Sequence, residues 1–125
     1  MVAGLLKLHK EHGSLPLEKV LQPAIAYAEN GFKILPGEAF RQQMAKEVLQ
    51  QYEGTKTHFL NAEGASFQAG DQVVQKTLAS VLKKIASNGK AGFYEGEVAK
   101  KIVDDIQANG GLLTLEDLKN YEALN

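Results

Sequence analysis

Two histidines near the start of the chain have a spacing that could hold a metal ion. His9 and His12 lie three residues apart in the run H-K-E-H, and imidazoles at this spacing on a helix can converge on one ion. The run lacks the histidine spacing of a zinc-protease helix and offers no third ligand nearby. We therefore interpret His12 as a cation near a helix C-terminus and predict no metal site. His58 lies in an irregular stretch and has no obvious partner.

Pairs of acidic residues are the second candidate for chemistry, because two carboxylates can act as general acid and general base. The pairs are Glu95 with Glu97, Asp104 with Asp105, and Glu116 with Asp117. Adjacent side chains on a helix point about 100° apart, so neighbouring carboxylates do not face one another. These pairs also fall near predicted helix starts or on solvent faces. Solvation and helix capping are therefore their preferred roles.

A glycine pair and two tyrosines complete the set of residues with a candidate role. Gly110 and Gly111 could cradle an anion, but no Lys or Arg stands at the spacing of a phosphate loop, which favours a helix stop. Tyr94 and Tyr121 are the aromatic residues most expected to have a polar partner, because a buried tyrosine hydroxyl usually needs one. We predict structural roles for both tyrosines.

The stretch from Phe93 to Tyr121 is predicted to form two helices joined by a stop. The first, from about Gly96 to Asn109, has its apolar residues on one side of a 3.6-residue period: Val98, Ala99, Ile102, Val103 and Ile106. Thr114 stands three residues before Asp117, which is a capping box with Asp in place of the usual Glu or Gln. The second helix has an apolar side that can fold back on the first, formed by Leu113, Leu115, Leu118 and Tyr121.

The preceding part of the chain is also predicted to be helical. Apolar periodicity predicts helices over residues 2–12, from about Pro16 to Asn30, over 38–52 and over about 78–88. The apolar stripe of the second passes through Pro23, so we expect a kink there or two abutting helices. Three helices end in Asn-Gly, which we interpret as a shared capping solution. The helical period of apolar residues is absent from residues 55–74, which are predicted to be an irregular excursion with at most a short β pair. Within it, residues 57–60 alternate between apolar and polar as in a strand.

Composition excludes several classes of protein. The chain of 125 residues suits one helical region, 1–125, and its 14 basic and 15 acidic residues form no basic stripe, so nucleic acid is not an expected partner. No apolar run approaches the roughly 20 residues needed to cross a bilayer, and the N-terminus lacks the pattern of a signal peptide. The absence of cysteine excludes disulfides and thiolate zinc sites but does not distinguish periplasm from cytosol.

Six motifs in order give the chain a family resemblance. They are V-A-G at residues 2–4, the run H-G-S-L-P-L-E-K-V-L-Q-P-A-I-A-Y-A-E-N-G-F at 12–32, G-D-Q-V-V-Q-K-T-L-A-S-V-L at 70–82, F-Y-E-G at 93–96, N-G-G-L-L-T-L-E-D-L at 109–118, and Tyr121. Together they resemble the large subunit of the γ-glutamyltranspeptidase (glutathione hydrolase) family over nearly the whole chain. The resemblance implies a mainly α segment of the large subunit of an αββα N-terminal-nucleophile hydrolase.

The resemblance also implies a chemistry whose residues lie elsewhere. In this family a precursor cleaves itself, and the threonine exposed at the start of the small subunit attacks the γ-glutamyl carbonyl, with its own α-amine as base and backbone amides around the oxyanion. The acyl-enzyme passes to water or to an amino acid or peptide. No metal or organic cofactor is implied. Arg41, the only arginine, lies outside any substrate-clamp motif, and the threonines lie in the wrong contexts: Thr55, Thr57, Thr77 and Thr114.

We accordingly assign no catalytic, cofactor-binding or metal residue, and predict that the chain alone neither cleaves itself nor turns over γ-glutamyl compounds. The expected partners are the remainder of the parent large subunit, the small subunit and, in the full enzyme, a glutathione-like substrate. Exposed apolar surface and self-association are also expected. The family places the parent in the periplasm or outside the cell. Two alternatives stay open: a segment of a related β-lactam acylase or poly-γ-glutamate enzyme, and a free-standing helical interaction module.

Overall fold

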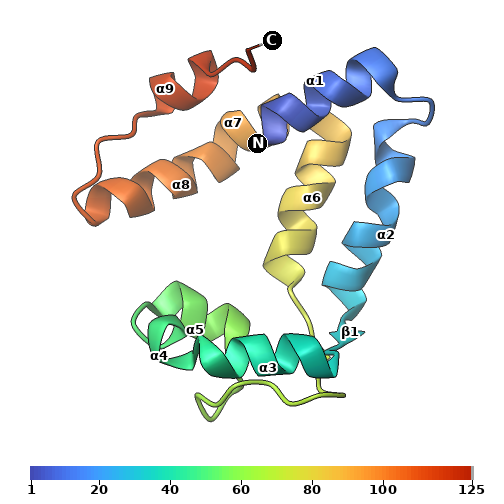
Figure 1. Ribbon diagram of the computed structural model, residues 1–125. Helices are drawn as coiled ribbons and strands as arrows, with labels where there is room; N and C mark the ends of the chain where they lie inside the picture. Colours follow the sequence, from blue (N-terminus) through green and yellow to red (C-terminus); the bar gives the residue numbers. More distant parts are fainter. Residues whose placement is uncertain (125) are drawn as a thin grey trace. The chain divides into compact units, whose positions relative to one another are not determined.

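The computed structural model describes residues 1–124, which fold into nine helices and two very short strands (Figure 1). The helices are α1 (Val2–His12), α2 (Leu17–Asn30), α3 (Pro36–Met44), α4 (Lys46–Leu49), α5 (Glu53–Phe59), α6 (Lys76–Asn88), α7 (Ala91–Tyr94), α8 (Gly96–Ala108) and α9 (Leu115–Asn120). The strands are β1 (Phe32–Lys33) and β2 (Gln72–Val73). The prediction of a mainly α chain is confirmed; its last position, Asn125, lies outside the described residues.

The chain divides into two compact units. The first, the terminal unit, joins residues 1–26 to residues 77–124, and the second, the central unit, is formed by residues 27–76. Helix α2 therefore begins in the terminal unit and ends in the central one. Each unit buries its own set of side chains, and each is considered by itself below.

Helix ends follow the predicted Asn-Gly signals. Gly31, Gly89 and Gly110 have φ angles of 84°, 57° and 82°, which an L side chain rarely adopts. Each comes directly after an asparagine at or next to the end of a helix, so the shared capping solution is confirmed. At Gly31 a side chain would also meet Val74 and Gln72, so glycine is required there on two grounds.

Two helices differ from their predicted course. Helix α2 passes through Pro23 as one element, so the alternative of two abutting helices is wrong, while a bend at the proline stays a prediction. The helix predicted over residues 38–52 is divided at Ala45 into α3 and α4. The Ala45 amide donates to Arg41 O (3.1 Å) and closes α3, and the Leu49 amide donates to Ala45 O (3.0 Å) and opens α4.

The stretch predicted to be irregular contains a helix as well as the β pair. Residues 57–59 belong to α5, so the strand-like alternation was misleading there; the Thr57 hydroxyl donates to Glu53 O within the helix. Strand β2 pairs with β1 in antiparallel register, Phe32 opposite Val73 and Lys33 opposite Gln72. A single bridge joins Leu60 and Ser66. The pairing buries Ile34 and Val73, which lie within the core of the central unit.

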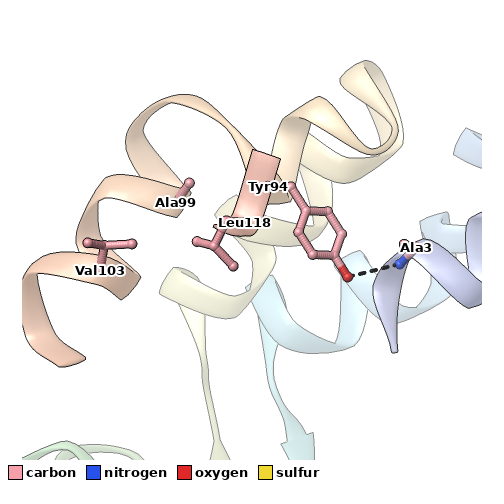
Figure 2. Close-up of a cluster of buried hydrophobic side chains, with 5 residues drawn as sticks. All are labelled: Ala3, Tyr94, Ala99, Val103 and Leu118. Atoms are coloured by element: carbon pink, nitrogen blue, oxygen red, sulfur yellow. Dashed lines mark hydrogen bonds between the residues drawn. The ribbon is translucent and has the colours of Figure 1, made fainter. Parts of the chain in front are cut away.

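The terminal unit has a core built by the predicted two-helix corner. Helices α7, α8 and α9 contact one another pairwise. Their buried side chains form a cluster with one residue of α1: Ala3, Tyr94, Ala99, Val103 and Leu118 (Figure 2). The predicted buried face of α8 is confirmed by Val98, Ala99 and Val103. On α9 Leu118 is buried, whereas Leu115 and the C-cap residue Tyr121 remain about half exposed.

Candidate functional site

Tyr94 connects the corner to the first helix of the chain. Its hydroxyl accepts a hydrogen bond from the Ala3 amide (3.1 Å), one of the first-turn N–H groups that have no partner within α1 (Figure 2). Its ring stacks on Tyr121 with centroids 5.5 Å apart and meets the edge of Phe93 at 5.0 Å. The predicted polar partner of Tyr94 is thus a backbone amide 91 residues away. Tyr94 therefore fixes the start of α1 against the corner.

Glu97 joins the start of α8 to the neighbouring α6. Its carboxylate accepts from Lys84 Nζ (2.5 Å) on α6 and from Lys101 Nζ (2.9 Å) one turn along α8. The hydrogen bond from Lys84, followed by that from Lys101, lowers the pKa of Glu97 from 4.5 to about 2. Because the group is exposed, this shift describes an ion-pair cluster on the surface. Glu97 is held ionised, which suits a positioning contact and not a general acid.

Asp117 forms the capping box predicted from the sequence. The Asp117 amide donates to Thr114 Oγ1 (3.1 Å), and the Thr114 amide donates to Asp117 Oδ2 (2.9 Å). The Thr114 hydroxyl also donates to Oδ2 (2.6 Å), and these bonds lower the pKa of Asp117. The box satisfies the orphan amides at the start of α9. The Thr114 hydroxyl is therefore part of the cap of α9.

The other acidic candidates have helical roles. Asp104 pairs with Lys100 one turn earlier (2.6 Å). Glu95 is the N-cap residue directly before α8, and Glu116 lies in the first turn of α9. Asp105 accepts through its backbone oxygen from the Asn109 side chain at the helix end (2.8 Å).

His9 and His12 have different partners in the structure. His9 Nε2 donates to Leu15 O (2.8 Å) and so ties α1 to the turn that follows it, whereas His12 Nε2 lies 4.0 Å from Glu11. Within residues 1–124 no group of three His, Cys, Asp or Glu side chains is placed to hold a metal ion. No helix in this described part is long and apolar enough to cross a membrane.

Arg41 and the threonines considered in the sequence analysis have local partners where the structure shows their bonds. Arg41 Nη2 pairs with Glu38 (2.7 Å) one turn back on α3. The Thr55 hydroxyl donates to Leu49 O and Tyr52 O at the start of α5, and Thr114 caps α9. These hydroxyls bond to backbone groups at helix ends.

A hollow beside α1 was not foreseen from the sequence. It encloses about 680 Å³ and lies between α1, the α6–α7 connection and the residues that follow α9. Its basic side chains are Lys7, Lys10 and Lys90, and its acidic ones are Glu11 and Glu122. Lys7 Nζ also contacts Ala123 O (3.5 Å). The hollow is wide open and carries both signs of charge.

Together these features define a helical scaffold in which polar groups serve caps and ion pairs. The gamma-glutamyltranspeptidase family model matches residues 1–124. The chain is 40% identical to the glutathione hydrolase proenzyme of Escherichia coli K12 over 98% of its own length and 21% of that protein. The crystal structure of Helicobacter pylori gamma-glutamyltranspeptidase superposes with a TM-score of 0.93 at 39% identity, over 97% of this chain and 35% of that one.

The chain belongs to the gamma-glutamyltranspeptidase family. A cephalosporin acylase from Bacillus halodurans has the same fold in this region, with a TM-score of 0.88 at 31% identity, over 96% of this chain and 23% of that one. The chain spans about a fifth of the length of the curated relatives it matches. The match therefore covers one part of these relatives.

Sequence reasoning missed the contacts that join distant parts of the chain. The Lys84 to Glu97 pair links two helices across 13 residues, and the Ala3 to Tyr94 bond spans 91. Helical periodicity reports only neighbours within about two turns, so neither pair has a local signal. Gly92 is a further example: a side chain there would overlap the backbone of Lys84, which shows that α7 packs directly on α6.

Proposed function

We propose that this chain is the helical part of the large subunit of a γ-glutamyltranspeptidase. The observation that carries the proposal is the alignment of the family over residues 1–124, with 40% identity to a glutathione hydrolase proenzyme. The parent enzyme cleaves the γ-glutamyl bond of glutathione and related compounds. It passes the γ-glutamyl group to water or to an amino acid or peptide through an acyl-enzyme on an N-terminal threonine outside this chain.

In this proposal the segment positions other parts of the enzyme and does no chemistry itself. Its caps and ion pairs hold α7, α8 and α9 in one corner, and the Tyr94 hydroxyl fixes α1 to that corner. We assign it no catalytic residue, metal or organic cofactor. Its partners are the rest of the large subunit, the small subunit and, in the assembled enzyme, a glutathione-like substrate. The parent acts in the periplasm or outside the cell.

An acylase is the second candidate, because the cephalosporin acylase from B. halodurans superposes over 96% of the chain. Both activities use acyl transfer through an activated nucleophile, so they differ in the acyl group and not in the scaffold. The parent protein should therefore be tested with a chromogenic γ-glutamyl anilide, with and without glycylglycine, and with a cephalosporin side-chain amide. Anilide release accelerated by glycylglycine supports the transpeptidase; cleavage of the amide alone supports the acylase.

The 125-residue chain is expected to be inactive in the same assay. Loss of the nucleophile, oxyanion donors and carboxylate clamp removes several kcal/mol of transition-state stabilisation each, so nothing above a heat-killed control should be released. Its intact mass should stay constant over days. Release of anilide, or an internal break that leaves a new N-terminal threonine, would show that the segment carries chemistry of its own.

A further inference from the structure

The Asn-Gly pairs at three helix ends can undergo a covalent change. They are Asn30-Gly31, Asn88-Gly89 and Asn109-Gly110, and all three asparagines are exposed. The backbone nitrogen that follows an asparagine can attack the Cγ atom of its side chain, and a glycine has no Cβ to shield that nitrogen. The attack requires that the nitrogen leave its hydrogen bond and that the side chain turn towards it. The three pairs therefore share one reactivity and differ in how the structure holds them.

Two of the pairs are held by α-helical hydrogen bonds. The Gly31 amide donates to Tyr27 O (2.9 Å), and the Gly89 amide donates to Ile85 O (2.8 Å), four residues back in each case. Each nitrogen thus continues the hydrogen-bond pattern of its helix by one residue. The chain is fixed again within a few residues, by β1 after Gly31 and by α7 after Gly89. Attack by either nitrogen requires the helix end to open.

The third pair lies outside the α-helical pattern. Asn109 is the C-cap residue of α8, with φ −98° and ψ 18°, and the Gly110 amide donates to Gln107 O (3.0 Å), only three residues back. A bond over three residues has poorer geometry than the α-helical one. A Cβ added to Gly110 would meet no atom within 4 Å, and residues 111–114 belong to no helix or strand. Local opening therefore costs less here than at the other two pairs.

Two further bonds at this helix end leave the reaction possible. The Asn109 Nδ2 atom donates to Asp105 O (2.8 Å) on the exposed surface, where water can replace the bond. The Gly111 amide donates to Ile106 O (2.8 Å) and fixes the residue after the attacking nitrogen. It involves neither the attacking nitrogen nor the side chain of Asn109.

We propose that Asn109 is a site of spontaneous deamidation and reacts faster than Asn30 and Asn88. The Gly110 nitrogen forms a bond to Asn109 Cγ, the bond from Cγ to Nδ2 breaks, and Nδ2 leaves as ammonia with the proton of the Gly110 amide. Water then opens the cyclic imide at one of its two carbonyls and gives aspartate or isoaspartate. The reaction needs only water. This proposal does not depend on the proposed function.

The product weakens the end of α8. A carboxylate replaces the Nδ2 donor, so the bond to Asp105 O is lost. The new negative charge lies at the negative end of the helix dipole and four residues from the carboxylate of Asp105. Isoaspartate also lengthens the backbone where the chain passes from α8 towards α9. The corner formed by α7, α8 and α9 should therefore lose stability as the site converts.

Peptide mass spectrometry tests the order of the three sites. Trypsin cuts after lysine and places each pair in its own peptide, 20–33, 85–90 and 102–119. The purified chain is kept in mildly alkaline buffer, and samples are compared with a fresh one for the exchange of an NH₂ group for OH. Peptide 102–119 should convert at least about threefold faster than the other two. In urea the three rates should come close together, because only the shared Asn-Gly sequence then remains.

Two variants test the atom that reacts and the effect of the product. Asn109→Gln keeps an amide but would have to close a larger ring, so peptide 102–119 should stop converting while the other two keep their rates. Asn109→Asp reproduces one product and should melt at a lower temperature than the native chain. Equal rates in the folded chain, or fastest conversion at Asn30 or Asn88, would overturn the proposal. An order that persists in urea overturns it as well, and an unchanged melting temperature overturns the effect on the corner.

Discussion

The corner of α7, α8 and α9 and the helical pair α3 and α4 have similar sequence patterns and opposite burial. Both place apolar residues at helical spacing, and in the corner these residues form the core that contains Val103 and Leu118. In α3 and α4 the apolar residues Phe40, Met44 and Val48 are each more than half exposed, while the polar Gln42 is buried. A 3.6-residue period thus identifies which side of a helix is apolar. Whether that side is buried depends on what the chain has to place against it.

The first prediction compares removal of side chains from the two regions. Leu118→Ala should lower the free energy of unfolding by about 2 to 5 kcal/mol, because it leaves a cavity in the corner. Phe40→Ala removes a larger side chain but should change it by less than about 0.5 kcal/mol, because that ring already faces water. Urea denaturation at a concentration where the chain is monomeric measures both. Similar losses of unfolding free energy in the two variants would contradict the difference in burial between Leu118 and Phe40.

The second prediction compares glycines of the same two regions. Gly92→Ala should destabilise the chain by about 1 to 3 kcal/mol, since the added methyl group overlaps the Lys84 backbone and must force α7 away from α6. Gly37→Ala on α3 meets no atom within 4 Å and should stabilise it by a few tenths to about 1 kcal/mol. Melting temperatures shifted in opposite directions are the expected result, and a tolerated Gly92→Ala would show that the two helices pack loosely.

The part of the fold predicted from sequence is the part with local signals. The capping box of Thr114 and Asp117 and the Asn-Gly stops use residues within one turn of one another, and all are present. The junction at Ala45 and the helix α5 were missed, because weak local preferences in a short stretch are decided by packing. The predicted exposed apolar surface is confirmed, but its place on α3 and α4 depends on tertiary structure.

The candidate site shows the same limit. Sequence motifs identified the family, and the structure gave the acidic pairs and histidines local roles in caps and ion pairs. The hydrogen bond from the Ala3 amide to the Tyr94 hydroxyl has no sequence signal. The sequence of α1 does not indicate which distant hydroxyl will contact the first turn of that helix. The assignment of no catalytic residue stays a prediction.

The third prediction concerns the hydrogen bond between Ala3 and Tyr94. Tyr94→Phe leaves the buried Ala3 amide without an acceptor, so it should cost about 1 to 3 kcal/mol, near the lower end because a helix terminus can recruit water. The control Tyr52→Phe, at an exposed position of the central unit, should have no measurable effect. Hydrogen exchange should also show faster exchange of the first-turn amides of α1 in Tyr94→Phe. Unchanged exchange there would mean that the hydroxyl does not hold this helix.

The fourth and smallest prediction concerns pH. The pKa of Glu97 is lowered to about 2, so its contribution to stability is fully present above about pH 4.5 and is lost as the pH falls from 4.5 towards 2. Glu97→Gln should therefore be slightly less stable than the native chain at pH 6 and equally stable near pH 2, and high salt should shrink the difference. Glu38→Gln on α3 should follow the same trend more weakly, because Arg41 alone among cations lowers its pKa. A difference that persists at pH 2 would contradict the assignment of Lys84 and Lys101 as the cause.

The most direct test of the contrast between the buried corner and the exposed apolar side chains of α3 is methionine oxidation. The chain has two methionines, Met1 and Met44, which are 89% and 74% exposed. Leu118→Met adds a third in the core of the corner at little cost in packing. Dilute peroxide oxidises exposed thioethers to sulfoxides, and peptide mass spectrometry gives the rate at each site.

In dilute solution Met44 should be oxidised nearly as fast as Met1, and the methionine that replaces Leu118 much more slowly. A Met44 that is protected even in dilute solution, or a methionine at position 118 that is oxidised as fast as Met1, would contradict the contrast between the two regions.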